Sequence, residues 1–130
     1  MYQYDIPLKV RSTERTPSLE YDPKDGSFTI KGASVPENAK LFYEPIISWV
    51  DGYVNYIAIK SSDVSIVVNV ELDYFSTKSM LCLVSIFKKF ETLNTAKINW
   101  IYDDVDIEEC GRDLATMINV EFNFINNLKT

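Results

Sequence analysis

Three hydroxyl side chains, those of Ser76, Thr77 and Ser79, follow a long apolar–polar alternation that begins at Val64. After them the apolar residues recur every three or four positions, so the hydroxyls stand where a strand gives way to a helix. The first backbone N–H groups of a helix have no partner within it and attract negative charge. A hydroxyl there can cap the helix, or it can carry a phosphate that these N–H groups receive. On residue type alone, the cap is the commoner role.

A second group of residues that can do chemistry is the acidic run Asp103, Asp104, Asp106, Glu108 and Glu109. Carboxylates bind divalent cations, but this run lacks the ligand spacing of a calcium loop. Carboxylates also cap and favour the N-terminus of a helix, and helical periodicity begins here. We therefore expect no metal site, and interpret the run as a helix start that offers an acidic docking patch to a basic partner surface.

The chain contains no histidine, which removes the commonest general base and metal ligand. It also contains no glycine-rich phosphate loop, no Cys-x-x-Cys pair and no Gly-x-Ser-x-Gly motif. Cys82 and Cys110 fall within apolar helical stripes and are interpreted as core thiols rather than a disulfide. We therefore predict no catalytic residues, no cofactor and no enzymatic activity. A small enzyme that uses the acidic run is the least supported alternative.

A length of 130 residues, with 46% hydrophobic and 25% charged residues, predicts a single globular domain over residues 1–130. The formal net charge of −6 disfavours nucleic acid as a partner, because phosphate backbones are also negative. No apolar run approaches the roughly 20 residues that span a bilayer, and the first residues do not form a signal peptide. We therefore expect a cytoplasmic protein without a membrane partner.

The three hydroxyls are positioned by the strand before them and the helix after them. The strand has one apolar face and one mostly polar face, as in a half-buried strand. Its apolar face consists of Val64, Ile66, Val68, Val70, Leu72 and Tyr74. The helix carries a single apolar stripe, which consists of Met80, Leu83, Val84, Phe87 and Phe90.

Two short strands precede this unit, at Ser18–Tyr21 and Ser27–Lys31, joined by a turn rich in aspartate, proline and glycine. Ser34 and Glu37 have the spacing of a capping box, which predicts a helix start at that point. Pro45 lies inside this helix, so we expect a kink there. The apolar stripe of the helix consists of Phe42, Ile46, Trp49 and Tyr53.

Beyond the central unit, the pattern predicts a strand at Lys97–Tyr102, a helix from the acidic run onward, and a last strand at Val120–Phe124. Gly111 within the helix costs about 1 kcal/mol relative to alanine, which indicates close packing at that position. The apolar stripe of this helix consists of Ile107, Cys110, Leu114 and Met117.

Strands that alternate with helices predict right-handed crossovers, and therefore a mixed, largely parallel α/β sheet with an N-terminal hairpin. Several strands have one polar face, whereas the strands of a doubly wound sheet are apolar on both. All helices should therefore cover one face. The residues expected on the open face are Ser65, Asn69, Glu71, Lys97, Asn99, Glu121 and Asn123. Those expected in the core are Ile66, Val68, Val70, Ile98, Trp100, Val120 and Phe122.

Three sequence motifs follow one another along the chain and are informative when taken together. The first is Phe28-x-Ile30-x-Gly32-x-Ser34-x-Pro36-Glu37-Asn38 followed by Phe42-x-x-Pro45-x-x-x-Trp49-x-x-x-Tyr53. The second is Tyr74-Phe75-Ser76-Thr77. The third is Trp100-x-Tyr102 followed by Asp106-Ile107-x-Glu109-x-Gly111-x-Asp113. Over roughly residues 13 to 125, this ordered set resembles the SiaC family of bacterial regulatory phosphoproteins, whose second signature reads Tyr-Phe-Asn-Thr.

The resemblance implies a small STAS-like α/β domain, similar to anti-sigma-factor antagonists, that switches partners without catalysis. In that family a protein kinase phosphorylates a threonine at the start of the central helix, and a metal-dependent serine/threonine phosphatase removes the phosphate. The unphosphorylated form engages an effector, a diguanylate cyclase for SiaC, in c-di-GMP signalling and biofilm regulation. The matching residue here is Thr77. Ser76 replaces the family asparagine and Lys78-Ser79-Met80 its serine-rich continuation, which makes Ser76 and Ser79 alternative acceptors.

Because the carboxyl ends of parallel strands gather their loops at one edge, the junction and the acidic helix start should lie near each other. We expect the effector to dock on residues from both, namely Tyr74, Phe75, Lys78, Ser79, Asp106, Glu108 and Glu109. The alternative is a constitutive protein-interaction domain without phosphoregulation, in which Thr77 is only a helix cap.

Overall fold

The computed structural model describes residues 7–60 and 65–127. In these two stretches the chain forms six strands and three helices. In chain order they are β1 (Leu8–Val10), β2 (Ser18–Asp22), β3 (Ser27–Ser34), α1 (Ala39–Lys60), β4 (Ile66–Phe75), α2 (Thr77–Phe90), β5 (Ala96–Tyr102), α3 (Val105–Met117) and β6 (Glu121–Asn126).

The strands lie in one sheet in the same order as in the sequence, β1 to β6. The pairs β1–β2 and β2–β3 are antiparallel, and the pairs from β3 to β6 are parallel. Each parallel crossover contains one helix and moves to the next strand in the same direction. Since such crossovers are right-handed, helices that follow steps in one direction all fall on the same face.

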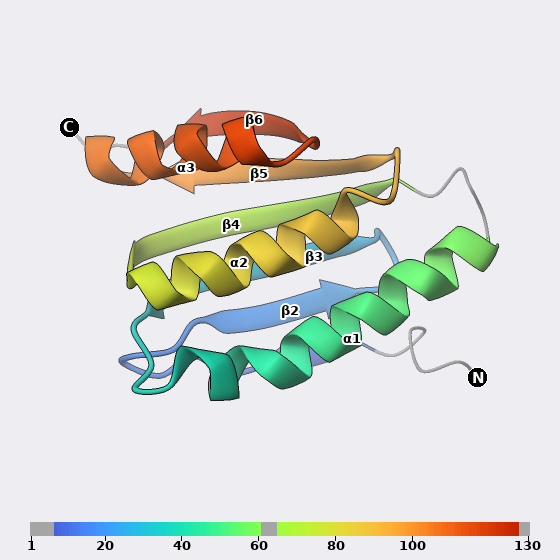
Figure 1. Ribbon diagram of the computed structural model, residues 1–130, viewed down its shortest axis with the longest axis horizontal. Coiled ribbons are helices and arrows are strands. Elements are labelled where there is room, and N and C mark those ends of the chain that lie inside the picture. Colours follow the sequence, from blue (N-terminus) through green and yellow to red (C-terminus); the bar gives the residue numbers. More distant parts are fainter. Residues whose placement is uncertain (1–6, 61–64, 128–130) are drawn as a thin grey trace.

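Figure 1 shows α1, α2 and α3 on one side of the sheet. This arrangement confirms the mixed, largely parallel sheet with an N-terminal hairpin and helices on one face. On the uncovered side, Lys97, Glu121 and Asn123 are exposed and Asn69 is half-buried, as the alternation predicted. The narrower likeness to anti-sigma-factor antagonists stays a prediction.

The core lies between the helices and the apolar face of the sheet. Five of the predicted strand residues are fully buried: Ile66, Val68, Val70, Ile98 and Trp100. Phe122 is only half-buried, because β6 is an edge strand with a neighbour on one side. Val120 is also half-buried and lies just before β6. Val64 lies outside the described residues.

Two residues predicted on apolar faces, Tyr74 and Met117, are exposed. Tyr74 is 53% exposed because the β3–β4 register shifts after Leu72, which reverses the alternation and turns Phe75 toward Trp100 instead. Met117, in the last turn of α3, is 48% exposed. Cys110 is half-buried. Both cysteines are free thiols, as predicted, and burial raises the pKa of each.

The predicted capping box at Ser34 and Glu37 is wrong. Ser34 is the last residue of β3 and is fully buried, and α1 begins only at Ala39. The side chain of Asn38 accepts the backbone N–H of Leu41 at 3.0 Å, which is the capping interaction that the helix start requires. Pro45 does lie inside α1, where it removes one backbone donor.

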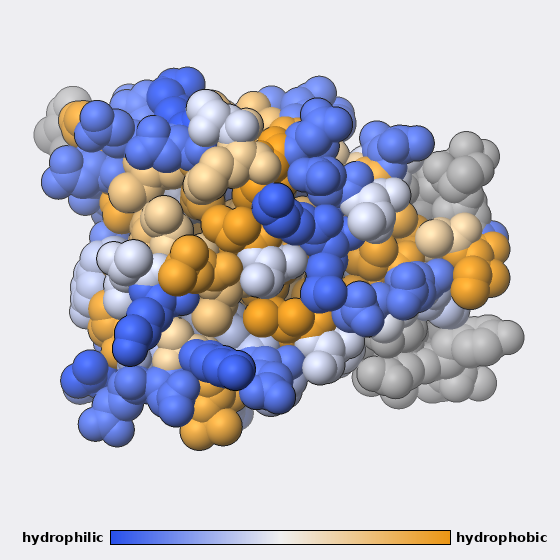
Figure 2. All heavy atoms as spheres, viewed as in Figure 1, coloured by the Kyte–Doolittle hydropathy of each residue, from blue (hydrophilic) through white to orange (hydrophobic). Residues whose placement is uncertain are grey.

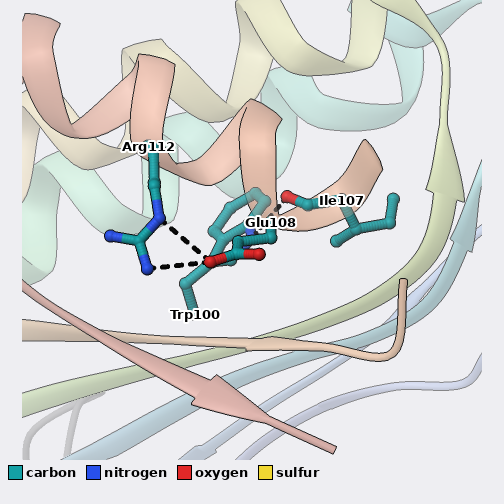
Figure 3. Close-up of polar contacts among 4 residues, drawn as sticks. All are labelled: Trp100, Ile107, Glu108 and Arg112. Atoms are coloured by element: carbon teal, nitrogen blue, oxygen red, sulfur yellow. Dashed lines mark hydrogen bonds and ion pairs between the residues drawn. The ribbon is translucent and has the colours of Figure 1, made fainter. Parts of the chain in front are cut away.

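Gly111 packs directly against the core, as predicted. A methyl group at this position would overlap the indole ring of Trp100. The ring cannot easily move away, because it is fully buried and its Nε1–H donates to the carbonyl oxygen of Ile107 at 2.8 Å (Figure 3). The glycine therefore lets α3 lie close to β5.

We expect Gly111→Ala to destabilise the fold by about 1–3 kcal/mol through overpacking, despite the higher helix propensity of alanine. Urea denaturation of the single variants and of Gly111→Ala combined with Trp100→Phe measures the effect. The smaller ring should relieve the overlap, so the double variant should lose less stability than the sum of the two single losses. Strictly additive losses would show that the two residues do not clash.

Candidate functional site

The candidate site lies at the edge of the sheet where the parallel strands end. Figure 1 shows all three helices starting at this edge, on the left of the view. The loops that follow Ser34, Phe75 and Tyr102 therefore converge there. Helix N-termini carry partial positive charge and unpaired N–H groups, so this edge favours anionic groups.

The junction between β4 and α2 is anchored by Ser76. Its side chain caps α2 by accepting the backbone N–H of Ser79 at 3.1 Å. Its own backbone N–H donates to the carbonyl oxygen of Ser34 at 3.0 Å, which ties the junction to the end of β3. The capping role therefore belongs to Ser76, and Thr77 is the first residue of the helix rather than its cap.

Behind the junction, a chain of buried hydroxyls connects α2 to β3 and α1. The Oγ atom of Ser79 accepts hydrogen bonds from Ser76 Oγ at 3.1 Å and from Ser34 Oγ at 2.9 Å. Ser34 Oγ in turn lies 2.6 Å from the hydroxyl of Tyr43. Ser34, Tyr43 and Ser79 are all fully buried, and burial raises the pKa of Tyr43 to about 12. Because Ser34 donates to Ser79, the protonated Tyr43 hydroxyl must donate to Ser34.

The three hydroxyls of the junction thus have different environments. Ser79 is completely buried, Ser76 is half-buried and engaged in the cap, and Thr77 is exposed. Lys78, directly after Thr77, is also exposed. An enzyme that modifies a hydroxyl from solvent can reach Thr77 without unfolding the junction, but it cannot reach Ser79 in this conformation.

The other residues expected at a docking surface divide into accessible and inaccessible ones. Tyr74, Asp106 and Glu109 are exposed, whereas Ser79 offers no side-chain surface. Phe75 is half-buried, with its ring edge-on to Trp100 at a centroid distance of 6.2 Å.

At the start of α3, the acidic residues have separate roles. Asp104 caps the helix by accepting the backbone N–H of Ile107 at 2.9 Å. Glu108 forms an ion pair with Arg112, one turn further along, at 2.8 Å (Figure 3). Asp106 and Glu109 remain exposed. Within residues 7–60 and 65–127, no three side chains of the ligand types His, Cys, Asp or Glu are grouped so as to hold a metal ion.

Sequence reasoning missed an apolar groove of about 630 Å³ that runs along the first three turns of α1 and α2. Its lining residues are Glu37, Asn38, Ala39, Lys40, Ile47, Lys78, Leu81, Cys82 and Ser85. In the groove, Leu81 of α2 is 61% exposed. Near the start of α1, Leu41 is 70% exposed. Figure 2 shows apolar residues gathered in the middle of the helical face with hydrophilic residues around them. The available signal was that Leu41 and Leu81 are leucines outside the core-facing stripes.

Comparison with known proteins identifies the fold. Apo-SiaC from Pseudomonas aeruginosa matches with a TM-score of 0.80 and 20% sequence identity, over 92% of this chain and 98% of that one. SiaC in the crystal structure of the diguanylate cyclase SiaD with its activator SiaC, from the same organism, matches with a TM-score of 0.81 and 20% identity. That match covers 92% of this chain and 99% of the other. None of the curated protein sequences matches the chain.

No helix in the described part of the chain is long and apolar enough to cross a membrane.

The model of the family described as "SiaC family regulatory phosphoprotein" matches residues 10–127. This match covers every strand from β2 onward, all three helices and the Ser76–Thr77 junction. The chain therefore belongs to the SiaC family of regulatory phosphoproteins.

Proposed function

We propose that the chain is a non-catalytic partner switch, reversibly phosphorylated on Thr77, whose unphosphorylated form binds an effector protein. The observation that carries this proposal is the division of roles at the junction, where Ser76 caps the helix and leaves Thr77 exposed. SiaC of Pseudomonas aeruginosa is described as an activator of the diguanylate cyclase SiaD. A diguanylate cyclase is accordingly the class of effector that we propose here, within c-di-GMP signalling and biofilm regulation.

A phosphate on Thr77 is compatible with the fold. It adds about 1.5–2 negative charges at pH 7, beside the N–H groups of the first turn of α2 and next to Lys78. None of the bonds in the buried hydroxyl chain involves the Thr77 side chain. Modification should therefore leave the junction intact, and a protein kinase and a metal-dependent serine/threonine phosphatase can act on the folded domain in the cytoplasm.

The same phosphate opposes binding of a partner at the junction. The groove that contains Lys78 and Leu81 begins within one turn of Thr77, and Tyr74 adds exposed aromatic surface on the preceding strand. A partner that covers this apolar surface would have to desolvate the phosphate as well, and an unpaired buried charge is costly. Phosphorylation can thus release a partner without any change in the fold.

The burial of Ser79 disfavours it as an alternative acceptor, and phosphorylation of Ser76 would remove the hydrogen that its Oγ donates to Ser79 Oγ. Thr77 is the acceptor that costs the fold least. A constitutive interaction domain remains the competing proposal, and it predicts that changes at Thr77 affect neither labelling nor affinity beyond ordinary surface effects.

We expect Thr77→Ala to bind the effector like the unmodified protein and to accept no phosphate from the cognate kinase. Thr77→Asp and Thr77→Glu should weaken effector binding by about tenfold or more, each tenfold being about 1.4 kcal/mol. All three variants should melt close to the wild type, because Thr77 takes no part in the buried hydroxyl chain. Calorimetric titration, radiolabelled phosphate transfer and thermal melts measure the three quantities.

Ser48→Asp is the matched control, since it adds a carboxylate at an exposed position of α1. It should leave affinity unchanged. Labelling of Thr77→Ala to the wild-type extent would show that another residue is the acceptor, and unchanged affinity of Thr77→Asp and Thr77→Glu would favour the constitutive domain.

The exposed carboxylates at the start of α3 form the second part of the proposed docking surface. We expect Glu109→Lys to weaken effector binding by about two- to fivefold, as is usual for an exposed charge at the rim of an interface. Glu109 is preferable to Glu108 because charge reversal at Glu108 would also break the ion pair with Arg112. Glu20→Lys, on the exposed face of β2, is the control and should bind as tightly as the wild type. Equal affinities for the two variants would place the acidic end of α3 outside the interface.

A further inference from the structure

The two edge strands of the sheet differ in how strongly they discourage pairing with a strand of another molecule. The edge strand β1 has only three residues, follows Pro7 and contains Lys9, and shortness, proline and lysine all discourage pairing with another strand. The other edge strand, β6, has six residues with the sequence Glu-Phe-Asn-Phe-Ile-Asn. It contains no proline, no lysine and one charged residue, Glu121. Figure 1 shows β6 along the upper border of the sheet.

Some backbone N–H and C=O groups of β6 point away from β5, at the outer edge of the sheet. Just after β6, the backbone N–H of Asn127 donates to the carbonyl oxygen of Tyr102 in β5 at 2.8 Å. Because backbone groups alternate along a strand, those of Asn123 also face β5. Those of Phe122 and Phe124 point away from the sheet, and no strand of the described chain lies beyond them.

A row of asparagine side chains crosses the open face of the sheet and ends at β6. Asn69, Asn99 and Asn123 are in register on β4, β5 and β6. The Nδ2 atom of Asn123 donates to Asn99 Oδ1 at 3.1 Å, and Asn99 Nδ2 donates to Asn69 Oδ1 at 2.9 Å. At the end of this row, the exposed Asn123 still has its carbonyl oxygen and a second N–H available, so the row is open toward the edge.

We propose that β6 pairs with β6 of a second copy of this chain, antiparallel and around a two-fold axis at Asn123. In this register Asn123 lies opposite its own copy, and the two amides extend the row across the interface. Phe122 lies opposite Phe124 of the partner copy, and their outward backbone groups form the hydrogen-bonded pairs of an antiparallel ladder. Glu121 lies opposite Ile125 of the partner copy, so the one charged residue of the strand never faces itself.

This self-complementarity is why a second copy fits the edge better than an unrelated strand. The register also brings aromatic rings together, since Phe122 and Phe124 already stack at 5.9 Å and would meet the same pair from the other copy. The guanidinium group of Arg112, which is ion-paired with Glu108, lies over the ring of Phe124 at 4.2 Å from its centroid. The net charge of −6 on each copy opposes association, so the dimer should strengthen as salt rises to physiological ionic strength.

A cysteine cross-link tests the pairing and its register. In a pair of this kind the two Cα atoms at residue 123 would be about 4.5 Å apart, within the range that a disulfide spans. Asn123→Cys should therefore form a covalent dimer under mild oxidation. Ile125→Cys is the matched control on the same face of the strand. Its two copies would be four positions out of register, about 14 Å apart, and should not cross-link.

The wild type, with Cys82 and Cys110, is treated in parallel, and peptide mass spectrometry identifies the bonded cysteine. Sedimentation of the wild type over rising concentration, at low and physiological salt, measures association without any cross-link. Asn123→Asp should shift the association to at least tenfold higher concentration, because it places two carboxylates opposite each other. Three results would overturn the proposal. They are a wild type that stays monomeric throughout, a cross-link that forms through Ile125→Cys instead of Asn123→Cys, and a dimer that Asn123→Asp leaves unchanged.

Discussion

The buried hydroxyl chain from Tyr43 through Ser34 to Ser79 and Ser76 is the constraint on which the candidate site depends. A buried hydroxyl that loses its partner costs about 1–3 kcal/mol, so the three elements that carry these groups must keep one relative position. The end of β3, the first turns of α1 and the start of α2 are thereby held together. Thr77 is the first residue of α2, next to the capping Ser76, and is exposed.

The topology agrees with our proposal that the ligand of this edge is a protein. The steps from β3 to β6 never reverse direction, so the described sheet has no switch point of the kind where open α/β sheets bind nucleotides in a crevice. The helix N-termini instead form a shallow edge with an apolar groove between α1 and α2. Charge added at such an edge changes which surfaces can dock while leaving the core untouched.

Periodicity was sufficient to predict the sheet, the one-sided helices and the polar face that carries Asn69 and Asn123, because each depends on local alternation of residue types. The capping box at Ser34 failed because Ser-x-x-Glu spacing is also local, whereas Ser34 is held in β3 by bonds to residues distant in sequence. For the same reason, sequence could not separate the buried Ser79 from the exposed Thr77. The assignment of Thr77 came from the family resemblance, and the structure adds the reason why this hydroxyl is accessible.

The most direct test of the switch is phosphopeptide mapping, with intact-mass measurement, of the chain purified from its native host under several growth conditions. We expect a single added phosphate whose fraction changes with conditions and which maps to Thr77. Neither Ser76 nor Ser79 should carry it. A chain that stays unmodified under every condition, or a phosphate that maps only to another residue, would contradict the proposal that Thr77 is the switch.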